Sequence, residues 1–143
     1  MFQCTLYGDP IPQKQTRFIL INGKPRCYDP SSKDKKSIQK EVRFLYPEEP
    51  ILGPVELTIH FFMPIPIHTS LRKREKMLNF IILPDKKPDE DNLAYLISNA
   101  LKKIVYNDDA QVCVKHVYKL YGDTPRTVIK VRKLDTIDPF TNQ

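Results

Sequence analysis

One segment decides how this chain is interpreted, residues 87 to 112, which read KPDEDNLAYLISNALKKIVYNDDAQV. Two acidic clusters lie on either side of a short apolar stretch in this segment. The clusters consist of Asp89, Asp91, Asp108 and Asp109. Carboxylates that converge repel one another unless a cation lies between them, and their hard oxygen atoms suit Mg²⁺ or Mn²⁺. The segment therefore predicts a metal site, provided that the apolar stretch folds so that both clusters meet.

The apolar stretch has the spacing of a helix. Its apolar residues recur at intervals of three and four, at Leu93, Leu96, Ile97, Ala100, Leu101 and Ile104. Pro88 suits the start of a helix and Asp89 is a good N-cap residue, so we expect the first turn here. Residues 104–106 are β-branched or aromatic and predict a strand that leads into the second acidic cluster. Each cluster alone also has a plainer interpretation, as a helix cap or as a turn.

The two motifs together resemble a known family. KPDEDNL, a helix that ends in ALKKIVYNDDAQV, and Lys119 in the following strand are similar to the RusA family of Holliday junction resolvases, small endonucleases that cut four-way DNA junctions. The resemblance is dense from Lys87 to about Gly122. It is weaker but consistent in YGDPIPQKQTRF and VELTIHFFMP, nearer the N-terminus.

The resemblance implies a site and a reaction. It makes Asp89, Asp91 and Asp109 the catalytic, metal-binding residues, with Asp108 as an adjacent further ligand. The cofactor is then Mg²⁺, with Mn²⁺ as an alternative, and the reaction is hydrolysis of a phosphodiester that leaves a 5′-phosphate. Because a junction is resolved by two symmetric cuts, we expect a twofold homodimer on branched DNA.

Two positions depart from the family's pattern. Tyr95 stands where the family commonly has a lysine, and Asn99 stands where it often has an acidic residue. The two changes lie four residues apart on the helix and remove one charge of each sign. Either both partners of a salt bridge have been lost together, so that neither charge is left unpaired, or the loss of the lysine has lowered the activity. Lys115 and Lys119, expected on the same strand side as Asp109, are the cations best placed to approach the site instead.

The charge balance favours a polyanion as partner. The chain has 143 residues with 23 Lys and Arg against 17 Asp and Glu, so its net charge is +6 even though the acidic motifs lower it. Carboxylates repel phosphate, so basic residues around the site must supply the affinity for DNA. The residues expected to contact DNA are Lys14, Arg17, Arg72, Lys73, Arg74, Lys76, Lys87, Lys115 and Lys119.

The remaining pattern predicts one α+β domain over residues 1–143. The resemblance to RusA implies a small mixed β-sheet packed with two or three helices. Alternation of apolar residues predicts strands at 2–7 and 55–63, the second in the middle of the sheet. Asn22-Gly23 predicts a hairpin turn between strands at 17–21 and 24–28. The last two strands are expected at 111–121 and 126–134, followed by a loose tail at 135–143.

Two basic segments have open interpretations. From about Pro30 to Tyr46, Ile38, Val42 and Leu45 mark the inner side of a helix, and its many basic residues form either a solvated face or a DNA-facing one. SLRKREKML, residues 70–78, is either a short basic helix capped by its serine or a mobile loop.

Composition limits the compartment and leaves two other function classes open. The three cysteines have no metal-ligand spacing and favour reduced thiols. Neither an export signal nor a long apolar stretch is visible, so we expect a cytoplasmic protein that does not cross a membrane. The alternatives are a catalytically weak branched-DNA-binding protein of the same fold and a globular protein without a nucleic-acid role. Cleavage and gel-shift assays on a synthetic junction discriminate among them.

Overall fold

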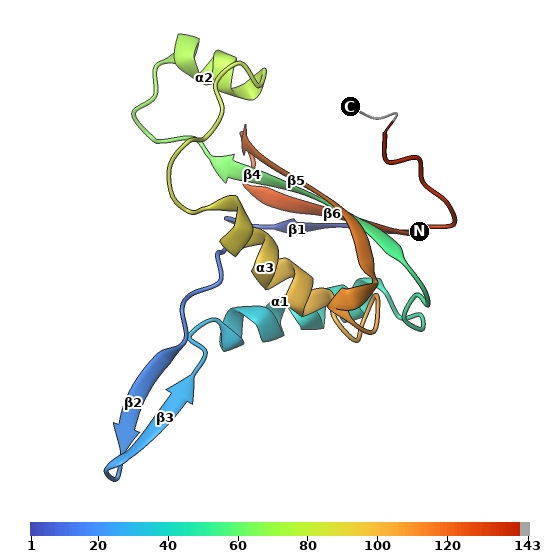
Figure 1. Ribbon diagram of the computed structural model, residues 1–143. Coiled ribbons are helices and arrows are strands. Elements are labelled where there is room, and N and C mark those ends of the chain that lie inside the picture. The colour runs from blue at the N-terminus through green and yellow to red at the C-terminus, as the bar shows by residue number, and fades with distance from the viewer. Residues whose placement is uncertain (141–143) are drawn as a thin grey trace.

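The computed structural model describes residues 1–140 and has a mixed four-stranded sheet at its centre, in the order β1-β6-β4-β5. The strands are β1 (Phe2–Tyr7), β4 (Val55–Pro64), β5 (Val112–Gly122) and β6 (Arg126–Lys133). Strand β4 is parallel to β5 and antiparallel to β6, which is antiparallel to β1. Helices α1 (Ser32–Leu45) and α3 (Glu90–Leu101) lie along one face of the sheet (Figure 1). The α+β class and the central position of β4 are confirmed.

Alternation along β4 determines which face the helices cover. Leu57, Ile59 and Phe61 are almost fully buried, whereas the residues between them are half-buried. Residues two apart in a strand share a face, so the buried set packs toward the helices. Leu93 and Ile97 of α3 belong to the same core. Burial of this apolar surface, rather than helix propensity, is what holds α3 against the sheet.

A two-stranded hairpin stands away from the rest of the molecule. It consists of β2 (Arg17–Ile21) and β3 (Lys24–Tyr28), whose ten residues are all exposed (Figure 1). Asn22 and Gly23 have φ angles of 52° and 74°, the left-handed conformation that a tight hairpin turn requires. The predicted hairpin is confirmed.

The basic segment before the acidic motif is a helix, α2 (Leu71–Leu78), so the alternative of a loop is wrong. Ser70 is its N-cap, and its hydroxyl accepts a hydrogen bond from the Lys73 N–H at 3.3 Å. Met77 is the buried residue of this helix. In Figure 1, α2 lies beyond the end of β4 and leads back toward the start of α3.

Two local expectations are wrong. Ile104 and Val105 form a turn after α3, and Tyr106 makes only isolated β-bridges with Ile51 and Lys102, instead of the expected strand. The Val105 N–H bonds to the Leu101 carbonyl, and the Val105 carbonyl accepts from the Ile51 N–H at 2.7 Å. These contacts override the local strand propensity. In α1, the side chain of Leu45 is exposed. Tyr46 packs on the core in its place, edge-on to the ring of Phe2.

The C-terminal segment and the thiols complete the description. Residues 135–140 form neither helix nor strand, and residues 141–143 of the expected loose tail lie outside the described part of the chain. Cys4 is buried, Cys27 and Cys113 are exposed, and all three are free. In the part of the chain that the structure describes, no helix combines the length and the apolar character needed to cross a bilayer.

Candidate active site

The first acidic motif lies at the start of α3. Asp89 is the N-cap residue by backbone conformation, but its carboxylate makes no capping hydrogen bond. It accepts instead from the Lys87 ammonium, with 2.8 Å between Oδ2 and Nζ. Asp91, in the first helical turn, is exposed, and its Oδ1 accepts from the Asn92 N–H at 2.8 Å. A capping role therefore does not account for the carboxylate of Asp89.

Both carboxylates of this motif act on a single cation. The hydrogen bond from Asp89 raises the pKa of the Lys87 ammonium, and the charges of Asp89 and Asp91 raise it further. All three side chains are open to solvent, so the arrangement contributes little to stability. Its significance is that the start of α3 forms a point of negative potential that already attracts a positive group.

The second acidic motif is a single 3-10 turn, Asp109–Gln111, which leads into β5. Asp108 is the N-cap, and its Oδ1 accepts from the Ala110 N–H at 3.3 Å. The strand expected to carry these residues begins only at Val112, so Asp108 and Asp109 are not alternating strand positions. Asp108 has a structural task in this turn, whereas no capping bond engages Asp109, which is exposed.

Gln111 holds this turn in place. Its Oε1 accepts from the N–H groups of Asn107 and Asp108, at 2.7 and 3.0 Å. Its Nε2 donates at 2.8 Å to two carbonyls of the loop before β4, those of Ile51 and Gly53. The sequence interpretation gave Gln111 no role, although a glutamine three residues after an aspartate is the spacing of a capping box.

Gln111→Ala is expected to loosen the turn that presents Asp109. The substitution removes four hydrogen bonds, two of them to carbonyls of a distant loop, and should lower the free energy of unfolding by on the order of 2 kcal/mol. Urea denaturation followed by circular dichroism measures this loss. Gln39→Ala on α1 is the matched control, and equal stabilities of the two variants would contradict the role assigned to Gln111.

Asp109 lines a cavity of about 330 Å³ together with Tyr95, Ser98 and Lys115. The Lys115 ammonium donates to the Ser98 hydroxyl at 3.1 Å, which ties β5 to α3 beside the carboxylate. Below them, the fully buried Tyr106 donates from its hydroxyl to the Ser98 carbonyl at 2.9 Å. Burial raises the pKa of Tyr106, and the negative charge of Asp109 adds to this effect.

Asp89 lines a second cavity, of about 630 Å³, together with Lys87 and Lys119. The Lys119 ammonium donates to the Lys86 carbonyl, so β5 also contacts the loop before α3. Lys115 and Lys119 are thus on the helix-facing side of β5, although Asp109 is not on that strand as expected. Being four residues apart, they are separated by about 13 Å along the strand.

The structure does not bring the three predicted ligands together. Asp89 and Asp109 line different cavities, and within residues 1–140 no three His, Cys, Asp or Glu side chains form a group that could hold a metal ion. Mg²⁺ is often held by one or two carboxylates and keeps several waters. The carboxylates of Asp89 and Asp91 fit such an ion in donor type and in their shared negative potential. Asp109 lies outside this pair.

The basic residues expected to contact DNA are distributed over several elements of the fold. Arg72, Lys73 and Lys76 are exposed on α2, and Arg74 beside them is half-buried. Lys87, Lys115 and Lys119 lie at the two cavities described above. Lys14 and Arg17 are both exposed; Arg17 is the first residue of β2, and Lys14 precedes it by three residues. The sequence interpretation therefore found surface cations but not their contacts.

Comparison with known proteins shows the family of this chain. The family model described as endodeoxyribonuclease RusA matches residues 8–132. A protein of Bacillus subtilis (strain 168), named uncharacterized protein YqaN, is 32% identical over 134 residues, which cover 91% of this chain and 94% of the relative. The family match includes the hairpin, strands β4 and β5, nearly all of β6, and both acidic motifs, and it begins just after β1. The chain therefore belongs to the RusA endodeoxyribonuclease family.

Proposed function

We propose that this protein is a metal-dependent endodeoxyribonuclease that cuts four-way DNA junctions by paired hydrolysis of phosphodiesters, in recombination and repair. The observation that carries the proposal is the arrangement around α3 in a chain of the RusA family. Asp89 and Asp91 lie at the start of the helix, and Asp109 faces its side together with Lys115. Neither the carboxylate of Asp89 nor that of Asp109 makes a capping hydrogen bond, so both are available for chemistry.

The cofactor in this proposal is Mg²⁺, which Mn²⁺ can replace. Asp89 and Asp91 would hold it in the arrangement described above, and Asp109, with Asp108 nearby, would join them only if the two motifs move together when metal and DNA bind. When bound, the ion supplies a nucleophilic water and positive charge at the phosphate. The donor type and the attraction of two carboxylates for one ammonium support this assignment at Asp89 and Asp91. Asp109 is assigned by its position in the family's second motif.

Lysine and arginine side chains of this protein would neutralise the negative charge of the phosphate. Lys115, held beside Asp109 by Ser98, is positioned to neutralise the charge that develops on a phosphate as it is attacked. The exposed basic residues of α2 and Lys14 would supply affinity for phosphates that does not depend on sequence. Lys87, paired with Asp89, becomes free for DNA once another cation takes its place.

A second copy of the chain provides the second cut, and the hairpin is its proposed contact. On one face of the hairpin the cross-strand pairs are Phe18 with Cys27 and Leu20 with Pro25, all apolar and all exposed. Phe18 and Leu20 are 79% and 76% exposed. A lone two-stranded hairpin is only marginally stable in water, and exposed apolar patches mark contact sites. Two such arms related by a twofold axis cover each other's apolar face.

Phe18→Asp is therefore expected to convert a dimer into a monomer, because it places a charge in the apolar contact. Light scattering at micromolar concentration should give twice the chain mass for the wild type and the single chain mass for the variant. Lys24→Ser, on the opposite face of the hairpin, is the control and should remain dimeric. A wild type that is monomeric both alone and on junction DNA would contradict paired cutting.

The experiment that tests the proposed function is a cleavage assay on a synthetic four-way junction, with and without Mg²⁺ or Mn²⁺. We expect paired nicks with 5′-phosphate ends only when the metal is present, and no cutting of a linear duplex of the same sequence. Cleavage that persists in EDTA would refute the metal dependence. Failure to bind the junction in a gel shift would refute the nucleic-acid role altogether.

One alternative is supported by specific observations. Tyr95 replaces the family's usual lysine, and the three predicted ligands do not form one group within residues 1–140. Both features suit a catalytically weak protein of the same fold that binds branched DNA. Tight junction binding without cleavage in either metal is the result that would select this alternative.

A further inference from the structure

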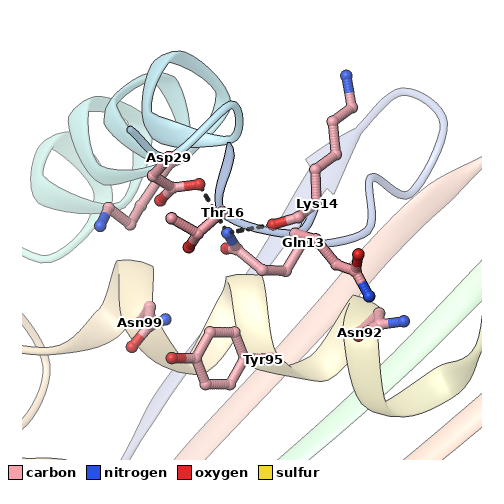
Figure 2. A pocket seen from close by; sticks show the side chains of 9 residues that line it. Gln13, Lys14, Thr16, Asp29, Asn92, Tyr95 and Asn99 are labelled. Atoms are coloured by element: carbon pink, nitrogen blue, oxygen red, sulfur yellow. Dashed lines mark hydrogen bonds between the residues drawn. The ribbon is translucent and has the colours of Figure 1, made fainter. Parts of the chain in front are cut away.

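A third cavity, of about 590 Å³, also has Tyr95 in its lining (Figure 2). Asn92, Tyr95 and Asn99 of α3 form one wall, and Gln13, Lys14 and Lys35 contribute to the others. Amide groups both donate and accept hydrogen bonds, and the phenol ring of Tyr95 is 56% exposed. A cavity of this size accepts a small planar molecule, and its lining suits one with polar edges and an aromatic face.

The wall opposite α3 is held rigidly. The Gln13 N–H donates to the Asn92 carbonyl at 2.9 Å, and the Lys14 N–H donates to the hydroxyl of the fully buried Ser31 at 2.8 Å. Asp29 in turn accepts from the Ser31 N–H at 2.9 Å. The segment before the hairpin is therefore fixed against α3 and does not need a ligand to order it.

One polar atom in this wall lacks a partner. The Gln13 Nε2 donates to the Asp29 carboxylate at 2.8 Å and to the Lys14 carbonyl at 3.1 Å, which fixes the orientation of the amide. The other end of that amide, Oε1, is buried and has no hydrogen-bond partner among the described residues. Buried acceptors are normally satisfied, so this oxygen can accept one further hydrogen bond, from a water or from a ligand.

Tyr95 connects this cavity to the proposed active site. Its side chain lines both the amide-lined cavity and the smaller one that contains Asp109 and Lys115. Lys14 and Lys35 place positive charge around the amide-lined cavity, where Asp29 is the acidic residue and is already paired with Gln13. A nucleotide whose phosphate lies beside Lys115 can thus place its base against the Tyr95 ring.

We propose that the amide-lined cavity binds one unpaired nucleobase of the DNA strand, stacked on Tyr95 with its polar edge facing the amides of Gln13, Asn92 and Asn99. The inference rests on the proposed function, since it places the base next to the phosphate that is cut. Bases at a branch point are less firmly stacked than those within a duplex and cost less to extrude. The site would thereby favour branched DNA over a continuous duplex.

Two short single-stranded probes test this site without any cleavage. One is a fluorescein-labelled oligothymidylate, and the other is an abasic oligomer of equal length with the same phosphates. Fluorescence anisotropy of the full-length protein, without divalent metal, should show about tenfold tighter binding of the probe that carries bases, the scale of one stacked base. Tyr95→Ala should abolish this preference and Tyr95→Phe should keep it. Asn99→Ala should reduce it.

The controls separate this proposal from the function on which it rests. Tyr7→Ala removes another exposed tyrosine, outside the cavity, and should leave the preference intact. Equal binding of the two probes by the wild type, or a preference that survives Tyr95→Ala, overturns the base site. A wild type that shows the preference but does not cut junctions would refute the nuclease and leave the base site standing. Thermal unfolding of each variant checks that it is folded.

Discussion

Replacing Asp89, Asp91 or Asp109 by asparagine should reduce cleavage of a four-way junction to the level seen without metal, while binding stays intact or becomes tighter. Asparagine keeps the size of the side chain but removes the charge that attracts a cation. It also removes a repulsion toward phosphate. At Asp89 the change has a second effect, because it releases the Lys87 ammonium from its ion pair toward the DNA.

Single-turnover cleavage and gel shifts on the same junction measure the two halves of this prediction. Asp135→Asn, outside both motifs, is the control and should behave like the wild type. Asp108→Asn should be milder, because its side-chain oxygen can still accept the hydrogen bond from Ala110 that caps the turn. Cleavage at nearly the wild-type rate in any of the first three variants would remove that residue from the site.

Lys115→Ala should slow single-turnover cleavage by roughly a hundredfold or more, with little change in junction binding. This is the scale of losing one preorganised electrostatic partner of a transition state. Lys115 lies in the cavity of Asp109 and Tyr95 and is oriented by Ser98, so it can supply the charge that Tyr95 cannot. Tyr95→Lys should consequently bring no gain in rate.

The alternative is that no residue of this chain replaces the cation that the family has at position 95. In that case, Tyr95→Lys raises the cleavage rate and Lys115→Ala leaves it nearly unchanged. Lys130→Ala on β6 is the control for a general loss of positive charge. Lys119→Ala tests the other lysine of β5, which contacts the Lys86 carbonyl and lines the Asp89 cavity instead. Equal rates for all these variants would show that no lysine here takes part in the chemistry.

The elements with strong local signals could be predicted from the sequence. The spacing of Leu93, Ile97 and Leu101 predicted α3, and Asn22-Gly23 predicted the hairpin turn, because each signal lies within one element. The β-branched and aromatic residues at 104–106 predicted a strand that the structure does not form. Their conformation is determined by hydrogen bonds to Ile51 and α3 and not by their own strand propensity.

The sequence singles out the candidate carboxylates, which remain a prediction, but it does not show what they contact. The acidic residues stand out in the sequence because two motifs flank one helix. The interactions of Gln111 with Ile51, of Lys115 with Ser98, and of Gln13 with Asn92 join residues far apart in the chain. The spacing of residues along the sequence does not indicate such long-range contacts. The position of Asp89 and Asp109 in two different cavities therefore could not be predicted from the sequence.

Because the last strand in the sequence, β6, lies between β1 and β4, the sheet can close only after the ribosome has released residues 126–133. A nascent chain that already carries both acidic motifs still lacks the strand that joins its beginning to its middle. Such a chain has no completed core on which α3 can rest. We therefore expect a chain truncated before Arg126 to lack a stable fold, because Ile129 and Val131 of β6 belong to the buried core.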